Sequence, residues 1–255
     1  MDKFLDTSPL ALEFYKIIYD GCFDNLDFSS GLRPYINIKE AFGYKLKNNI
    51  ELSGDKDFNF SKGYAWSRLD LYHKSLENSE VDAKTKKMVL HNLELCEELT
   101  DSCVNISLLP KTGALNIYKQ CVGNDRLDVF ASILNMYYVE GKEFIFSLSS
   151  FDNMPIIKEF LDIFKEDGIE SYFANMYRTS NGGMGLVDEL VELGGTALYE
   201  YWQINKFMNL AYTYWSQRLK YINKVIEDNH LEVTDEVSME LARVIELLNA
   251  WYSEV

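Results

Sequence analysis

Hydrophobic residues that recur every three or four positions predict that most of the chain is helical. Ser8 and Pro9 are suited to the start of the first helix, and Asp82 can cap another. A third helix begins near Asp125 and is expected to carry Asp128 on its polar side. The expected helical ranges are 9–20, 82–99, 125–138, 155–168, 169–177, 196–228 and 234–252.

The last two expected helices carry the most regular hydrophobic stripes. Their apolar residues alternate spacings of four and three, and Thr234 can cap the second helix after the short turn EDNHLEV. We therefore expect a C-terminal antiparallel helical hairpin, although the same stripes would also serve a homodimer formed through these helices. The stripe residues are Ala197, Tyr201, Ile204, Met208, Ala211, Trp215, Val237, Leu241, Val244, Leu248 and Trp251.

Alternating apolar and polar residues add a small β-sheet near residues 34–52 and 103–109. The expected fold class is therefore α+β and predominantly α-helical. The glycine-rich stretch NGGMG at 181–185 is the best candidate for a domain boundary. We expect an α+β domain over residues 1–180 and a helical hairpin over residues 186–255 packed on it, and the alternative is one domain that includes both.

The net charge of −15 is concentrated toward the C-terminal end, since residues 131–255 hold 9 basic and 20 acidic side chains. Phosphate backbones and anionic lipids repel such a chain, so non-specific binding to nucleic acid or to a membrane surface is not expected. No apolar stretch is long enough for a transmembrane helix, and the first residues do not form a signal peptide. We expect a cytoplasmic protein whose acidic surface attracts a basic protein partner.

An acidic cluster near the C-terminal end is the candidate surface for that partner. No Lys or Arg lies between Lys224 and Arg243. Acidic residues also suit a solvated loop and the start of a helix, where they interact favourably with the helix dipole, so both interpretations stay open. The cluster consists of Glu227, Asp228, Glu232, Asp235, Glu236 and Glu240.

The cysteines and histidines show no metal-ligand spacing. Neither His91 nor His230 has a second His or Cys at such a spacing, so we expect no metal and no cofactor. The cysteines are widely spaced and lie in largely apolar contexts, which is typical of free thiols in a reducing compartment. They are Cys22, Cys96, Cys103 and Cys121.

A second candidate site lies in PKTGALNIYKQCVGNDRLDVF, residues 110–130, where polar side chains surround two glycines and a helix start. Backbone amides there could cradle an anion. The helix dipole disfavours Arg126 in the first turn, so we expect it to pair either with an anionic ligand or with an internal carboxylate. The candidate ligand-binding residues are Thr112, Asn116, Lys119, Asp125, Arg126 and Asp128.

The stretches NDRLDVFASILNMYY and IIKEFLDIFKEDGIESYF resemble a family of uncharacterised bacterial proteins over about residues 105–178. In that family an Asn and a basic residue precede an Asp-Arg-apolar-Asp helix start, which Asp125, Arg126 and Asp128 match. The resemblance implies no activity and no ligand.

Arg68 and His73 in RLDLYH form an arrangement that resembles the catalytic motif of HEPN-type RNases, in which an Arg and a His act together on a phosphodiester. Two residues at this spacing also occur as ordinary surface or pairing groups. An RNase would in addition need a basic approach path for RNA, which the acidic charge of the chain disfavours.

The favoured function is that of a non-enzymatic binding or regulatory protein whose acidic, helical C-terminal half meets a basic, nucleic-acid-handling protein. An inhibitor in phage defence or counter-defence fits this description. One alternative is an enzyme or sensor that binds a phosphorylated small molecule or nucleotide through Lys119 and Arg126. The other is a HEPN-like RNase that uses Arg68 and His73.

Overall fold

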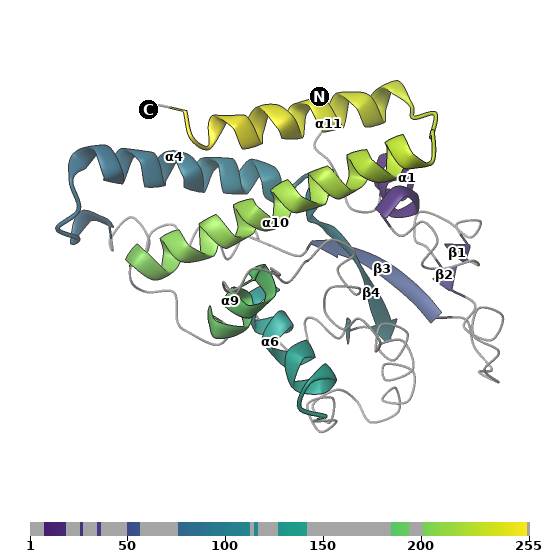
Figure 1. Ribbon diagram of the computed structural model, residues 1–255, viewed down its shortest axis with the longest axis horizontal. Coiled ribbons are helices and arrows are strands. Elements are labelled where there is room, and N and C mark those ends of the chain that lie inside the picture. Colours follow the sequence, from purple (N-terminus) through teal and green to yellow (C-terminus); the bar gives the residue numbers. More distant parts are fainter. Residues whose placement is uncertain are drawn as a thin grey trace.

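The structure is a computed structural model that describes residues 8–18, 26–27, 35–36, 50–56, 76–112, 115–116, 127–141, 185–193 and 201–253. The fold is predominantly helical, as the sequence predicts (Figure 1). The helices are α1 (Pro9–Ile18), α4 (Ala83–Thr100), α6 (Leu127–Tyr138), α9 (Leu186–Leu193), α10 (Tyr201–Asp228), α11 (Asp235–Ala250) and the 3-10 helix η1 (Cys103–Asn105). The expected helices over 155–168 and 169–177 lie outside the described residues.

The expected starts of α1 and α4 are confirmed. Ser8 accepts the backbone N–H of Ala11 at 3.2 Å. One carboxylate oxygen of Asp82 accepts the backbone N–H groups of Lys84 and Thr85, both at 3.0 Å. The hydrogen bond that the Thr85 hydroxyl donates is the largest of the effects that lower the pKa of Asp82. Both helices therefore begin where a side chain satisfies an otherwise unpaired amide.

The strands follow one another in an antiparallel sheet with the order β1-β2-β3-β4-β5. Strands β3 and β4 form its longest pair, with a register that runs from Leu52 opposite Pro110 to Lys56 opposite Ile106. The sequence placed the sheet near 34–52 and 103–109. The strand bounds are β1 (Leu26–Asp27), β2 (Tyr35–Ile36), β3 (Ile50–Lys56), β4 (Ile106–Thr112) and β5 (Leu115–Asn116).

Residues 103–105 form η1 and not the start of a strand, which corrects the sequence-based prediction. The backbone N–H of Asn105 donates to the carbonyl of Ser102 at 3.1 Å, and its side-chain amide donates to the carbonyl of Thr100 at 3.1 Å. These local bonds hold the segment in a tight turn directly after α4. Pairing with β3 begins only at Ile106.

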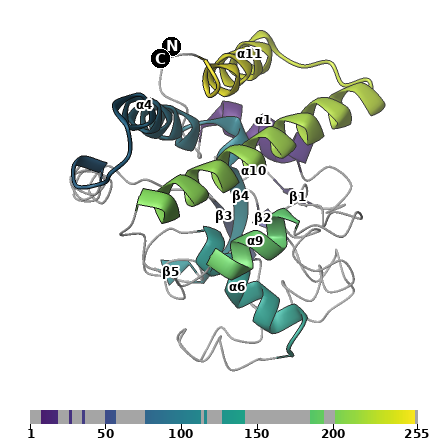
Figure 2. The same ribbon diagram turned by 60° about the vertical axis from the view of Figure 1, so that its left-hand side comes forward.

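Helix α10 crosses the middle of the molecule, as two views show (Figures 1 and 2). It packs against α4, α1, η1 and α11, and its first half also packs against α9, which in turn contacts α6. Helix α11 runs antiparallel to α4, because Ala250 lies next to His91 while Arg243 lies next to Glu98. The hairpin is thus built into the rest of the fold through both of its helices.

The expected hairpin of α10 and α11 is confirmed, and hydrogen bonds on both sides of the turn define it. After α10, Leu231 N–H donates to the carbonyl of Ile226 at 3.0 Å and His230 N–H to that of Glu227 at 3.3 Å. This Schellman arrangement requires a left-handed residue, and His230 takes that place with a φ of 50°. Thr234 then caps α11 through the N–H of Val237 at 3.4 Å.

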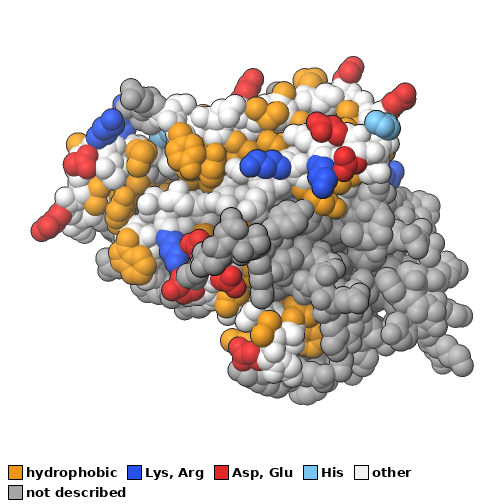
Figure 3. Space-filling view, in the orientation of Figure 1, with side chains coloured by type: hydrophobic (Ala, Val, Ile, Leu, Met, Phe, Trp, Pro, Cys, Tyr) orange, Lys and Arg blue, Asp and Glu red, His pale blue; other side chains and the backbone are white. Residues whose placement is uncertain are grey.

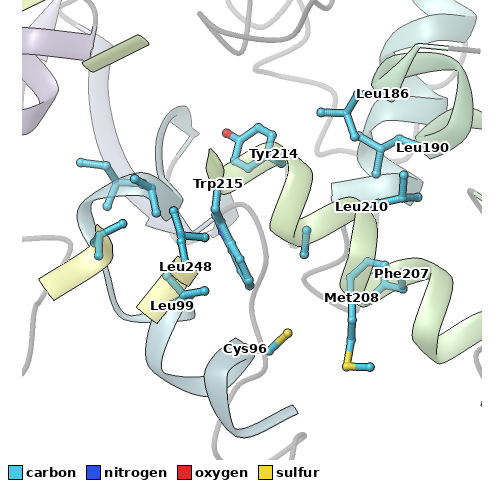
Figure 4. Packing of buried hydrophobic residues seen from close by; sticks show 14 of the residues in the cluster. Cys96, Leu99, Leu186, Leu190, Phe207, Met208, Leu210, Tyr214, Trp215 and Leu248 are labelled. Carbon is cyan, nitrogen blue, oxygen red and sulfur yellow. The ribbon is translucent and has the colours of Figure 1, made fainter. Parts of the chain in front are cut away.

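One buried cluster contains the hydrophobic stripes of both hairpin helices together with side chains from α1, α4, η1, α6 and α9. Figure 4 shows Trp215 of α10 pointing toward Cys96 and Leu99 of α4, with Leu248 of α11 close by. The expected stripe is confirmed at Ile204, Met208, Ala211, Trp215, Val237, Val244, Leu248 and Trp251, all of which are buried. The division of the chain into two domains near residues 181–185 stays a prediction.

Candidate partner-binding surface

The turn between α10 and α11 carries five exposed carboxylates, which we call the acidic tip. Figure 3 shows acidic side chains gathered where α10 turns into α11. The five residues lie in the last turn of α10, in the loop and in the first turn of α11. The short connection between the two helices brings these three segments together. None of the five takes part in an ion pair with another described residue. They are Glu227, Asp228, Glu232, Asp235 and Glu236.

Glu240 was expected in the same cluster, but the structure places it inside the protein, where it is 1% exposed. Its carboxylate accepts the backbone N–H of Cys103 at 3.1 Å and two hydrogen bonds from the guanidinium of Arg243, at 2.8 and 3.0 Å. The reason is its position on α11, three residues after Val237 and four before Val244, both of which are buried. Glu240 therefore anchors η1 and is not available to a partner.

Arg243 is the only Lys or Arg that follows Lys224 in the chain, and it is committed to internal partners. Besides Glu240, it donates to the carbonyl of Asp101 at 2.8 Å and lies 3.7 Å from Glu98. Burial acts to lower the pKa of Arg243, but the hydrogen bonds and charge of Glu240 outweigh it and raise that pKa. The positive charge of Arg243 is thus used inside the fold and is not offered to the carboxylates of the acidic tip.

The buried cation Arg218 was not anticipated from the sequence. It is completely buried on α10 and donates to the carbonyl of Ile106 at 3.0 Å and to the hydroxyl of Tyr214. The guanidinium carbon Cζ of Arg218 also lies 5.2 Å from the centre of the Tyr214 ring. The signal was present in the sequence, since Arg218 follows the stripe residue Trp215 by three positions.

Trp215 completes this buried polar group by donating its indole N–H to the side-chain oxygen of Asn105 at 2.8 Å. Asn105 is completely buried and belongs to η1, the segment that Glu240 also holds. Helices α10 and α11 therefore both bind the junction between α4 and the sheet. A buried polar network of this kind fixes one arrangement of the elements, because each unpaired group would cost roughly 1–3 kcal/mol. The network therefore serves the structure of the fold.

Cys96 and Cys103 are buried free thiols. Burial raises the pKa of both well above the ordinary thiol value, with a smaller contribution from Glu97 for Cys96 and from Glu240 for Cys103. A neutral, inaccessible thiol is neither a nucleophile nor a metal ligand. In the described part of the chain, no group of three or more His, Cys, Asp or Glu side chains could hold a metal ion.

The anion site expected in residues 110–130 is described only in part. Thr112 and Asn116 lie at the turn between β4 and β5, where Thr112 pairs with Leu115 and Lys111 with Asn116. Lys119, Asp125 and Arg126 lie outside the described residues, as do Arg68 and His73 of the expected RNase motif. Neither site is therefore tested.

Asp128 was expected on the polar face of its helix, but it is completely buried. Ala131 and Leu134 on α6 are buried as well, and Asn135, two turns after Asp128 on the same side, is partly covered. The helix is thus covered on the side that the sequence pattern assigned to solvent. The prediction that Asp128 lies on a solvent-facing side of the helix is therefore wrong.

No described helix combines the length and the apolar character that a membrane span requires. The resemblance to an uncharacterised bacterial family over about residues 105–178 stays a prediction. Comparison of the chain with protein-family models, with curated proteins and with solved structures finds no match.

Proposed function

We propose that the protein is a non-enzymatic binding or regulatory protein that engages a basic protein partner through the acidic tip of its C-terminal hairpin. The observation that carries the proposal is the division of charge around the hairpin. The five carboxylates of the tip are exposed and make no ion pair with described residues, whereas Arg243 is bound to the buried Glu240. The tip thus presents concentrated negative charge on a rigid support.

Exposed apolar side chains on α11 favour a protein partner over a simple counter-ion. Met239 is 53% exposed and Ile245 is 41% exposed, and both lie on the helix that begins at the tip. Apolar contact combined with complementary charge is the usual composition of a transient protein interface. A partner that handles nucleic acid would offer the matching basic surface, which it needs for phosphate contacts.

The test compares two variants with the same change in net charge. One neutralises the acidic tip (Glu227→Gln, Asp228→Asn, Glu232→Gln, Asp235→Asn and Glu236→Gln). The control neutralises five other exposed acids (Glu77, Glu80, Glu94, Glu97 and Glu140, each changed to Gln). Partners are captured from nuclease-treated lysate of the native host and identified, and their affinity is measured with purified proteins.

We expect a basic partner that binds wild type and the control but not the tip variant. Its affinity should fall by about tenfold or more between about 0.05 M and 0.5 M salt, because exposed charges are screened over this range. A partner that binds the tip variant as well as the control, or whose affinity does not depend on salt, would refute the proposal. The nucleotide or phosphate site at Lys119 and Arg126 and the RNase motif stay predictions.

A further inference from the structure

A cleft lies between α9 and the first half of α10, far from the acidic tip. The two helices are side by side in both ribbon views (Figures 1 and 2). The cleft has a volume of about 430 Å³, within the range of about 300–1,000 Å³ that holds small organic groups. It is lined by Glu189, Tyr201, Trp202, Asn205, Lys206, Asn209, Leu210 and Thr213.

Leu210 supplies an aliphatic part of the cleft lining. Leu210 is buried, and Figure 4 shows it next to Leu190 of α9. Trp202 is 60% exposed although it lies beside Tyr201 at the start of α10. Three other aromatic side chains of the helix, Phe207, Tyr214 and Trp215, are buried, and Trp202 is the most exposed aromatic residue of α10. Trp202 is therefore the aromatic residue of the cleft lining with the most surface available to a ligand.

The charges around the cleft determine which ligand can use that ring. Lys206 is the only cation among the lining residues, and its ammonium group lies 2.9 Å from the carboxylate of Glu192. Glu189 forms no ion pair with another described residue. With Lys206 neutralised by Glu192, the carboxylate of Glu189 leaves the cleft with a net negative charge.

The uncharged polar groups of the cleft add acceptors. Asn209 donates through its side-chain amide to the carbonyl of Asn205 at 2.9 Å, which leaves its own side-chain oxygen available as an acceptor. The hydroxyl of Thr213 in turn donates to the carbonyl of Asn209 at 2.8 Å. A positively charged hydrogen-bond donor matches an aromatic ring, a carboxylate and amide oxygens, whereas a phosphate matches none of them.

We propose that the α9–α10 cleft binds an organic cation, a guanidinium or alkylammonium group, between the Trp202 ring and the Glu189 carboxylate. The source of the cation is either a free amine metabolite or an arginine or lysine side chain of a protein. This site is independent of the acidic tip, since Trp202 and Asp228 are separated by about 39 Å along α10 at 1.5 Å per residue.

The experiment follows the indole N–H signal of Trp202 by NMR during titration with propylguanidinium and with its neutral analogue propylurea. The signal is assigned with Trp202→Phe. We expect a saturable shift with propylguanidinium alone. Glu189→Gln should weaken binding about threefold, the scale of an exposed ion pair, and Trp202→Ala, followed through the other cleft signals, about fivefold. Lys206→Gln should tighten it, because a competing positive charge is removed.

The control Glu246→Gln removes an exposed acid on α11 and should leave the affinity unchanged. Agmatine then represents a free amine metabolite, and a blocked Gly-Arg-Gly peptide represents an arginine side chain of a protein. The one of these two probes that binds more tightly identifies the source of the cation, and either result supports the site. The proposal is overturned if propylguanidinium produces no saturable shift, if propylurea binds equally well, or if Glu189→Gln and Lys206→Gln change the affinity in the same direction. Neutralising the acidic tip should not affect this binding, so the two proposals can fail separately.

Discussion

Glu240 and Glu246 lie on the same helix, six residues apart, yet the first is 1% exposed and the second faces solvent. The buried carboxylate has a counter-ion in Arg243 and a backbone donor in Cys103. The exposed carboxylate has no ion-pair partner in the described part of the chain. One residue type therefore has two roles on α11, one in holding the fold and one in its surface charge.

The same contrast holds for two tryptophans of α10. Trp215 is completely buried and bonded to Asn105, whereas Trp202 is largely exposed beside the α9–α10 cleft. In both pairs the buried residue binds the junction at η1, whereas the other residue is exposed. The comparison predicts that mutation of the buried member of each pair lowers stability and that mutation of the exposed member does not.

The largest effect is expected from the tryptophans. Trp215→Ala should lower the free energy of unfolding by about 4 kcal/mol, because it opens a cavity in the core and leaves Asn105 without its indole donor. Trp202→Ala should change it by less than about 0.5 kcal/mol. Urea unfolding followed by circular dichroism measures both. Equal losses of the free energy of unfolding in the two variants would contradict the distinction between the buried and the exposed tryptophan.

The glutamates give the next largest effect. Glu240→Ala should cost about 3 kcal/mol, since it removes the carboxylate that pairs with the half-buried guanidinium of Arg243 and that accepts the buried amide of Cys103. Glu246→Ala should cost less than about 0.5 kcal/mol. In urea titrations the double variant Glu240→Ala, Arg243→Ala should be more stable than the sum of the single losses predicts. Strict additivity would contradict the pairing seen in the structure.

Periodicity located most of the described helices well. Residues 82–99 were expected as a helix and α4 covers Ala83–Thr100, while 125–138 became Leu127–Tyr138. Local signals suffice here, because capping side chains and a repeat of three or four residues act within one helix. The beginning of α11 at Thr234 was anticipated for the same reason.

Burial of charged residues could not be read from local patterns with the same success. Glu240 falls on the hydrophobic stripe of α11, but its role depends on η1, which lies 137 residues earlier in the chain. Asp128 and Arg218 were likewise misplaced or overlooked, because a helical wheel shows which residues share a face and not what covers that face. A charged residue at a stripe position is the signal that would have identified Glu240 and Arg218.

The smallest expected effect is a change in stability with pH that arises from a buried residue of α4, Cys96. Burial, and to a lesser extent Glu97, raises the pKa of Cys96 in the folded protein, so this thiol stays neutral there after its unfolded counterpart begins to ionise. The stabilisation is fully present below the unfolded pKa and is lost as pH rises toward the folded pKa. Above about pH 8.5 the stability of wild type should therefore fall, relative to Cys96→Ala, by up to about 1.4 kcal/mol per pH unit.

Urea titrations under reducing conditions from about pH 7.5 to about pH 10 measure this difference. The ionisation of tyrosines and lysines that both proteins share cancels in the comparison. A difference that stays constant over this range would mean that Cys96 ionises as easily in the folded chain as in the unfolded one, which its complete burial against α10 does not allow.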